Sequence, residues 1–375
     1  MGCHLSIMNF SFQIGKIMGI PFRIHLTFLA IIPWVAYAFG AVSMQLFGKP
    51  YGFGAVEPSS IKWIYSFAFA IFLFVCVALH ELGHSYVAKK YGIVIRSITL
   101  YVFGGVSSME EIPRNPKLEL QMAFAGPAVS GILGVACLLI YFESEALLGT
   151  NHPFSIFLWT TGIVNLTLMV FNLIPAFPMD GGRVFRAWLA EHMPYVRATN
   201  LAASVGKMFA IAMGILGLFS GSFLLLLVAF FVYIGATEEG RATAINICLE
   251  GIKVRDIMSA DVHTVDPSMT LGQLSDLMFH EKHRGYPVMD NGVPAGMVTI
   301  ADVQKVPEDQ RSSTTVGQVM ARKIYDIDPD VEATAAMKIM NERGVRRLPV
   351  MEAGRMIGIL SREDLVRAIE LCSRQ

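Results

Sequence analysis

Two histidines and a glutamate lie together in the segment His80-Glu81-Leu82-Gly83-His84, at the end of an apolar run. On a helix with 3.6 residues per turn, His80 and His84 share one face, so both imidazoles can bind one metal ion. Glu81 would lie beside the water on that ion, where a carboxylate can act as a general base. The alternative is that the motif arises by chance where a helix end emerges into polar surroundings, with Lys89 and Lys90 as its interfacial anchors. The cost of ionisable groups in a membrane segment favours the metal site.

The candidate for a third metal ligand is Asp180, since a catalytic zinc ion usually has three protein ligands and one open position. It lies in the stretch Asn172-Leu-Ile-Pro-Ala-Phe-Pro-Met-Asp-Gly-Gly182. Two prolines interrupt a regular helix there, and two glycines allow close backbone approach. Irregular backbone at membrane depth is tolerated where it lines a cavity within the protein. We therefore expect one zinc ion per chain, bound by His80, His84 and Asp180.

The charged residues that frame these groups are unevenly distributed along the 375 residues. Residues 1–251 carry 26 charged side chains, whereas residues 252–375 carry 34. A membrane part therefore precedes a soluble part, because a membrane part excludes most charges. The formal net charge of zero excludes a strongly basic nucleic-acid binder, so no nucleic-acid partner is expected. The five cysteines are scattered singly, without the spacing of a disulfide framework.

Charge-poor runs predict about six transmembrane helices, since each needs about 20 apolar residues. They cover residues 24–48, 63–79, 120–142, 153–179 (helical to about Phe171), 201–218 and 223–237. The last two are either one bent span or a hairpin turning at residues 220–222. Six spans leave 12 Lys and Arg on one side and only Lys49 and Lys62 on the other. The positive-inside rule then predicts a multi-pass cell-membrane protein with its N-terminus and C-terminal part in the cytoplasm.

The soluble part contains an internal repeat with an offset of 62 residues, which aligns Pro287-Val288 with Pro349-Val350 without a gap. Each copy predicts a short strand ending at Asp-Pro, an amphipathic helix (271–281 or 333–343), two strands and a second helix. The repeat resembles a tandem pair of CBS domains, which form an α/β module. That resemblance implies contacts to an adenine nucleotide from Thr299, Asp302, Ser361 and Asp364. It is equally compatible with a pair that only forms a homodimer.

The membrane part resembles the site-2 protease family of intramembrane zinc metalloproteases. The resemblance rests on His-Glu-x-x-His and Asn-x-x-Pro-x-x-x-x-Asp-Gly, and on further stretches at residues 20–25, 103–106 and 125–127. It implies that His80, His84 and Asp180 bind zinc, that Glu81 is the general base and that Asn172 contacts the substrate or the oxyanion. One departure is Ser130, where many members have Asn, so no polar contact is carried over from that position.

We therefore expect a polytopic α-helical membrane protein with a small re-entrant β element, followed by a soluble tandem CBS module. The expected domains are residues 1–240 for the protease, 252–307 for the first CBS domain and 315–372 for the second. The expected reaction is hydrolysis of peptide bonds within or next to transmembrane segments of membrane-anchored proteins. A short strand pair within residues 93–106 could bind an unwound substrate by strand addition.

Two alternatives lack proteolysis: a CBS-regulated transporter or channel, and a metal-free scaffold. Broken helices with a buried Asp also mark transport sites. The sequence shows no inverted repeat, and a transport function leaves the His-Glu-x-x-His segment unexplained.

Overall fold

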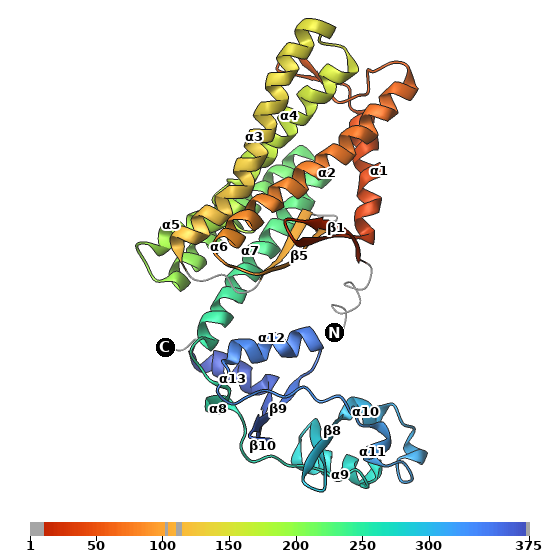
Figure 1. Ribbon diagram of the computed structural model, residues 1–375, viewed down its shortest axis with the longest axis vertical. Coiled ribbons are helices and arrows are strands. Elements are labelled where there is room, and N and C mark those ends of the chain that lie inside the picture. The colour runs from red at the N-terminus through yellow and green to blue at the C-terminus, as the bar shows by residue number, and fades with distance from the viewer. Residues whose placement is uncertain (1–10, 102–103, 110–114, 373–375) are drawn as a thin grey trace. The chain divides into compact units, whose positions relative to one another are not determined.

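The computed structural model describes residues 11–101, 104–109 and 115–372. The chain divides into two compact units, Met1–Arg241 and Ala242–Gln375. The first holds the apolar helices and a four-stranded sheet, and the second holds the repeat (Figure 1).

Within the described residues, five helices are long and apolar enough to cross a membrane. A shorter apolar helix, α1, has 16 residues, or about 24 Å at 1.5 Å per residue. The first expected span, at residues 24–48, corresponds to α1, so five of the about six expected spans have the length and composition to cross a membrane. The six corresponding helices are α1 (Leu26–Ala41), α2 (Ser59–Lys90), α3 (Pro116–Leu148), α4 (Pro153–Asn172), α6 (Tyr195–Ser220) and α7 (Phe223–Leu249).

Local sequence explains where several of these helices begin and end. The Asn115 side chain accepts hydrogen bonds from the backbone of Lys117 and Leu118, and Pro116 starts α3. At α4, the His152 side chain accepts a hydrogen bond from the backbone of Phe154, and Pro153 starts the helix. Gly221 adopts a left-handed conformation with φ of 64° and ends α6. The segment 201–237 is therefore a helical hairpin rather than one bent span.

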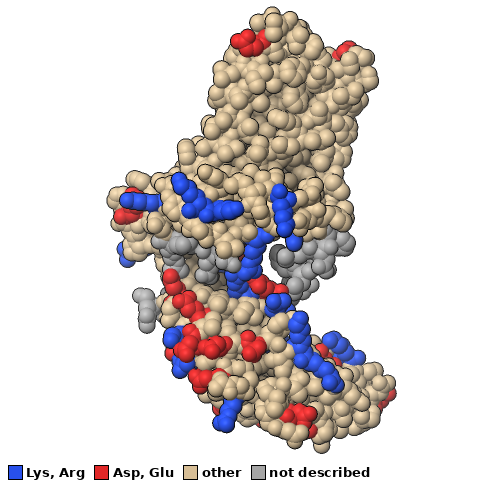
Figure 2. Space-filling model, viewed as in Figure 1, with Lys and Arg blue, Asp and Glu red and all other residues tan. Residues whose placement is uncertain are grey.

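On the face that Figure 2 shows, charged side chains are almost absent from the long apolar part of the first unit. The blue side chains of Lys and Arg form a belt at one end of that unit, and few charged groups appear at the opposite tip. An apolar surface bounded by basic residues is the pattern of a protein that crosses a bilayer.

A sheet in the order β1-β2-β5-β6 lies at the same end of the first unit as the amino-terminal end of α1 (Figure 1). Its strands are β1 (Ser11–Ile17), β2 (Ile20–His25), β5 (Ile95–Tyr101) and β6 (Gly104–Met109). The predicted strand pair corresponds to β5 and β6, whereas β1 and β2 were not predicted. Ile20, Phe22 and Ile98 pack against Ala78 and Leu82 of α2, so the sheet covers the helix next to the histidines. A separate hairpin joins β3 (Met44–Leu46) to β4 (Lys49–Tyr51).

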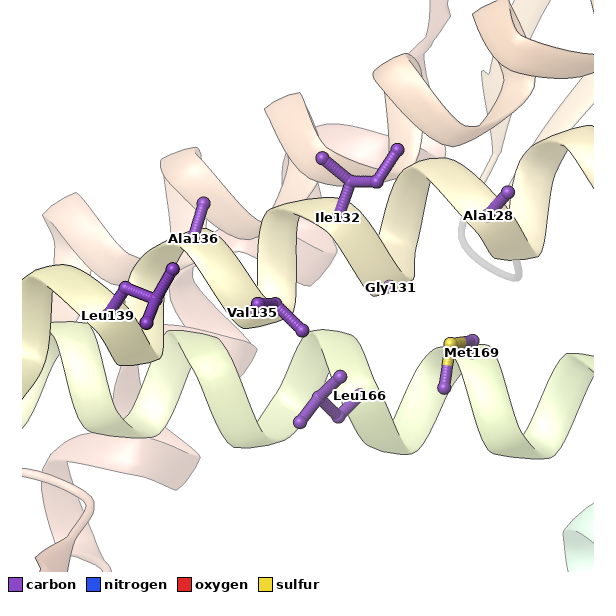
Figure 3. Close-up of a pocket in the computed structure, with 8 residues that line it drawn as sticks. All are labelled: Ala128, Gly131, Ile132, Val135, Ala136, Leu139, Leu166 and Met169. Carbon is purple, nitrogen blue, oxygen red and sulfur yellow. The ribbon is translucent and has the colours of Figure 1, made fainter.

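An open groove of about 520 Å³ lies along α3 and α4 (Figure 3). Its lining is apolar and includes Ile132, Val135, Leu139, Leu166 and Met169. Such a lining has no group for acid–base or metal chemistry, so this groove is not the site of the expected reaction.

The second unit contains two copies of one α/β motif. The first comprises α8 (Val254–Ile257), α9 (Leu271–Glu281), β7 (Gly285–Asp290), β8 (Val293–Thr299) and α10 (Ile300–Gln304). A short 3₁₀ turn, η2 (Glu308–Gln310), leads to the second: α11 (Val316–Val319), α12 (Ala333–Arg343), β9 (Arg347–Glu352), β10 (Arg355–Ser361) and α13 (Arg362–Cys372). The helices predicted at 271–281 and 333–343 are therefore present.

The two copies bury equivalent residues 62 positions apart, such as Val288 and Val350, or Met278 and Met340. The strand predicted before each Asp-Pro is reduced to one bridge, Val265 with Val288 and Ile327 with Val350.

Cys248 and Cys372 form a disulfide between the ends of α7 and α13, with their Cα atoms 5.6 Å apart. The spacing of the cysteines along the chain gave no indication of this pair. The two cysteines are 124 residues apart in the chain, and only the packing of the second unit brings them to bonding distance.

Candidate metal centre

Helix α2 places both histidines of the sequence motif on one face. His80 and His84 are separated by one turn, and their Nε2 atoms lie 3.2 Å apart. Their ring planes are inclined at 78°, so the rings meet edge to face rather than in a stack. Both are largely buried, which leaves two nitrogen atoms directed at one point inside the protein.

Asp180 reaches the same point from the first residue of α5 (Asp180–Ala190), a short helix that follows the irregular stretch after α4. Its Oδ2 atom lies 3.2 Å from the Nε2 of His80 and 3.2 Å from that of His84. Two glycines make this approach possible. A Cβ on Gly181 would lie 2.3 Å from the Ile174 carbonyl oxygen, and one on Gly182 would lie 2.6 Å from the Phe177 nitrogen.

This donor set fits a zinc ion. Ligand atoms at about 2.0–2.1 Å from a tetrahedral centre are about 3.3 Å from one another, close to the three separations of 3.2 Å. Two imidazole nitrogens and one carboxylate oxygen are also the ligand types of many catalytic zinc sites. Among the residues that the structure describes, this is the one group of three or more His, Cys, Asp or Glu whose ligand atoms converge in this way.

The outer nitrogen of each histidine has a partner that orients its ring. His84 Nδ1 donates to the Met122 carbonyl oxygen at 2.7 Å. That nitrogen therefore carries the proton, since a carbonyl can only accept, and Nε2 is left with a lone pair for a metal. His80 Nδ1 lies 2.9 Å from the Ser130 hydroxyl. No contact could be carried over to Ser130 from the family resemblance, but the structure places its hydroxyl within hydrogen-bond distance of His80.

Gly126 of α3 lies directly against the two ligand nitrogens. A Cβ atom there would lie 2.2 Å from His84 Nε2 and 2.6 Å from His80 Nε2. A side chain at this position would therefore occupy the space where the histidines meet the metal. The stretch Ala125-Gly126-Pro127 has no evident role in the sequence, and the close approach of α3 to α2 supplies one for Gly126.

Glu81 follows His80 on α2 and packs beneath β6. A Cβ on Gly105 would lie 2.3 Å from Glu81 Cγ and 3.2 Å from its Oε1. The absence of a side chain at Gly105 therefore lets the backbone of β6 pass over the glutamate. Because β6 is an edge strand of its sheet, this edge lies beside Glu81.

Asn172 is the last residue of α4, eight positions before Asp180. Its side-chain nitrogen donates to the Leu168 carbonyl oxygen at 3.0 Å, and the residue is half-buried. The structure therefore gives this side chain a local partner within its own helix.

The four residues expected to contact a nucleotide form two matching pairs in the second unit. The Thr299 hydroxyl donates to Asp302 Oδ2 at 2.7 Å, and the Ser361 hydroxyl donates to Asp364 Oδ2 at 2.6 Å. Burial raises the pKa of Asp302, but hydrogen bonds from Thr299 and Lys305 outweigh it and lower that pKa below its ordinary value. Each carboxylate also accepts a backbone N–H, from Thr299 or Ser361, so the pairs stabilise the starts of α10 and α13.

Comparison with family models finds two matches along this chain. The model of peptidase family M50 matches residues 68–154 and 146–213, which include His80, His84 and Asp180. The CBS domain model matches residues 254–309 and 316–371.

Individual proteins match either nearly the whole chain or one part of it. A zinc metalloprotease of Methanocaldococcus jannaschii is 37% identical over 366 residues, which cover 97% of this chain and 97% of that protein. A CBS domain-containing protein of Bacillus subtilis is 29% identical over 114 residues, 30% of this chain and 81% of its own. The solved site-2 protease from M. jannaschii is 41% identical, covers 62% of this chain and 95% of its own, and has a TM-score of 0.44.

Proposed function

Since this chain belongs to peptidase family M50, the site-2 proteases, we propose that it cleaves peptide bonds within or next to the transmembrane segments of membrane-anchored proteins. It is a zinc metalloprotease with several membrane-spanning helices and a pair of CBS domains. We assign residues 1–240 to the protease domain, with His80, His84 and Asp180 as the zinc ligands. The observation that carries this assignment is the triangle of ligand atoms with 3.2 Å sides.

Zinc, when bound there, supplies a Lewis acid that polarises a carbonyl and makes water reactive near neutral pH. Glu81 takes a proton from the attacking water on its carboxylate and passes it to the nitrogen of the leaving amine, so that water adds across the C–N bond. Ser130 and the Met122 carbonyl hold the imidazoles in the orientation that directs Nε2 inward. The substrate helix must unwind first, because its carbonyls are internally hydrogen-bonded.

Two measurements on the purified full-length protein test this function. The first is the zinc content per chain in detergent. The second is cleavage of a reporter protein with a single transmembrane segment, reconstituted with the protease in lipid vesicles. A chain that binds no zinc after reconstitution with the metal would favour a transporter or a scaffold instead.

We assign substrate binding to Asn172 and to the β6 edge, because β6 passes over Glu81 and an edge strand can pair with an extended peptide. Replacement of Asn172 with alanine is expected to lower kcat/KM by about 10²-fold, the typical loss of one oxyanion donor, with zinc content unchanged. Asn165 provides a matched control, since its side chain makes the same bond to the carbonyl four residues earlier. Removal of the β5–β6 edge should also abolish cleavage. Unchanged reporter cleavage in either case would contradict the assignment.

We assign the N-terminus and the CBS pair to the cytoplasm from the distribution of Lys and Arg. Lys89 and Lys90 end α2, and Arg183 follows α4; both helices would return to that side. Lys49 lies in the connection between α1 and α2, and Lys62 lies in the first turn of α2, on the opposite side. Accessibility of a C-terminal tag to protease in sealed, right-side-out vesicles tests this orientation. A tag cleaved from outside would refute it.

For the CBS pair, at residues 252–307 and 315–372, we propose an adenine nucleotide as the regulatory ligand and a homodimer as the assembly. The matching Thr299–Asp302 and Ser361–Asp364 pairs support two equivalent polar positions at the starts of helices. We expect ATP, ADP or AMP to change the rate of reporter cleavage, and Asp302→Ala with Asp364→Ala to remove the change. Sedimentation of the full-length protein measures the dimer. Equal rates at saturating concentrations of all three nucleotides would refute the regulation.

A further inference from the structure

Arg186 of α5 is a buried arginine that joins four helices of the first unit. Its side chain is 7% exposed. Its Nε donates to Glu119 Oε1 of α3 at 2.7 Å, and its Nη1 donates to Glu239 Oε1 of α7 at 3.1 Å. The hydroxyl of Tyr195, at the start of α6, donates to the other oxygen of Glu119 at 3.0 Å. One guanidinium thus connects α5 to α3 and α7 directly, and to α6 through Glu119.

This network contacts two of the segments that position the metal ligands. The Arg186 guanidinium lies 4.9 Å from the centre of the Phe177 ring, in the irregular stretch three residues before Asp180. Glu119 lies about one turn before Met122, whose carbonyl accepts the hydrogen bond from His84. Arg186 therefore touches the segment that presents the aspartate ligand and pairs with the helix that orients one histidine ligand.

Helix α7 packs along the same irregular stretch through one face. A Cβ on Gly235 would lie 2.7 Å from Pro178 Cγ, and Ala236 shares a buried cluster with Phe177. Glu239 follows about one turn later and bonds Arg186. Gly235, Ala236 and Glu239 lie at i, i+1 and i+4 and so share one face of α7. A shift or rotation of α7 would therefore displace both the stretch before Asp180 and helix α5, which begins at Asp180.

If Arg186 and its carboxylate partners served only to stabilise the fold, apolar side chains could do so at lower cost. Burying a charged pair costs several kcal/mol in desolvation, and well-packed apolar side chains of similar volume often stabilise a protein as well or better. What an arginine offers is a planar fork of donors with fixed directions. That property suits a residue that must hold several helices in one relative position.

We infer that Arg186 is a positioning residue for the metal centre, and that its bond to Glu239 lets α7 set the position of Asp180 relative to His80 and His84. Helix α7, which bonds Arg186 through Glu239, continues to Leu249, and Leu249 is buried in the core of the second unit. The inference rests on the proposed zinc site, and it supplies a route by which the CBS module can act on the site.

The test uses the full-length protein in detergent and measures two properties of the metal site directly. Apparent zinc affinity is obtained by competition with a chelator, and ligand geometry by the visible spectrum of the cobalt-substituted protein. Arg186→Lys keeps the positive charge and loses the fork. We expect it to weaken zinc binding about tenfold, the lower end of the loss found for groups that bond metal ligands directly, because Arg186 acts one contact further out, and to change the cobalt spectrum. Glu239→Gln should change both in the same direction by a smaller factor.

Glu238→Gln is the matched control, since Glu238 is the neighbouring residue on α7, its side chain is 67% exposed and it pairs only loosely with Arg241 at 3.7 Å. It should leave zinc affinity within twofold of wild type. If Arg186→Lys does not fold, Glu239→Gln and Tyr195→Phe carry the test. The first removes the negative charge from the Arg186–Glu239 pair, the second removes the hydrogen bond to Glu119, and both leave the Arg186–Glu119 pair intact. Wild-type zinc affinity and cobalt spectrum in folded variants would overturn the inference. Retention of zinc by Asp180→Ala would instead refute the proposed site.

Discussion

Replacing Glu81 with glutamine is expected to abolish peptide-bond hydrolysis while the protein keeps one zinc ion per chain. The amide has nearly the shape of the carboxylate and cannot accept a proton from water. Loss of a positioned general base lowers the rate by about 10²- to 10⁴-fold. Zinc should remain, because the three proposed ligands, His80, His84 and Asp180, are unchanged.

The measurement is cleavage of a membrane-anchored reporter beside zinc content, in the same preparation. Glu143→Gln serves as the control, since Glu143 is exposed and lies in the last turns of α3. Cleavage by the Glu81 variant at the wild-type rate would remove Glu81 from the mechanism. A transport or scaffolding function would be largely insensitive to this substitution, so the same variant separates the proposed function from both alternatives.

Replacing Gly126 with alanine is expected to prevent zinc binding although the protein still folds. The new methyl carbon would lie 2.2 Å from His84 Nε2 and 2.6 Å from His80 Nε2, far inside van der Waals contact. The rings must move away, which separates the ligand atoms. Alanine in place of glycine within a helix otherwise stabilises it by about 0.5–1 kcal/mol. A variant that has lost its zinc but keeps the helical content of the wild type therefore has a blocked site and is not unfolded.

Gly131→Ala, five residues later on α3, is the matched control for this substitution. Its methyl group would meet the Met169 sulfur at 2.6 Å, and that flexible side chain can move aside. We expect this variant to keep one zinc per chain and Gly126→Ala to lose it to the extent that Asp180→Ala does. Normal zinc content in folded Gly126→Ala would mean that the two histidine nitrogens do not share a metal in this position.

The features that were predicted correctly from the sequence are those that depend on residues close together in the chain. The histidine pair is one helical turn apart, so any helix through residues 80–84 places both on one face. The 62-residue repeat predicts two copies of one α/β motif, and the helices at 271–281 and 333–343 follow from their own periodicity. The end of α4 at Asn172 follows from the prolines after it.

Other features could not be read from the chain because they depend on which helices become neighbours. Strands β1 and β2 are short. The pairing of β2 with β5, the packing of β2 on α2 and the pairing of β1 with β2 stabilise them. Cys248 and Cys372 carry no spacing signal across 124 residues. Nothing local indicates that Arg186, Glu119 and Glu239 form one network, since each alone resembles an interfacial charge.

The sequence by itself determined the family, the metal chemistry and the order of the two parts, because these reside in residue types at short, fixed spacings. The sequence named Asp180 as the candidate third ligand, but only the tertiary structure shows how a residue 96 positions beyond His84 comes to lie 3.2 Å from the histidine nitrogens. It alone shows that Gly126 and Gly105 leave room beside them. The reason is physical: spacing along a helix is set by backbone geometry, whereas contact between helices is set by side-chain volumes over the whole packed bundle.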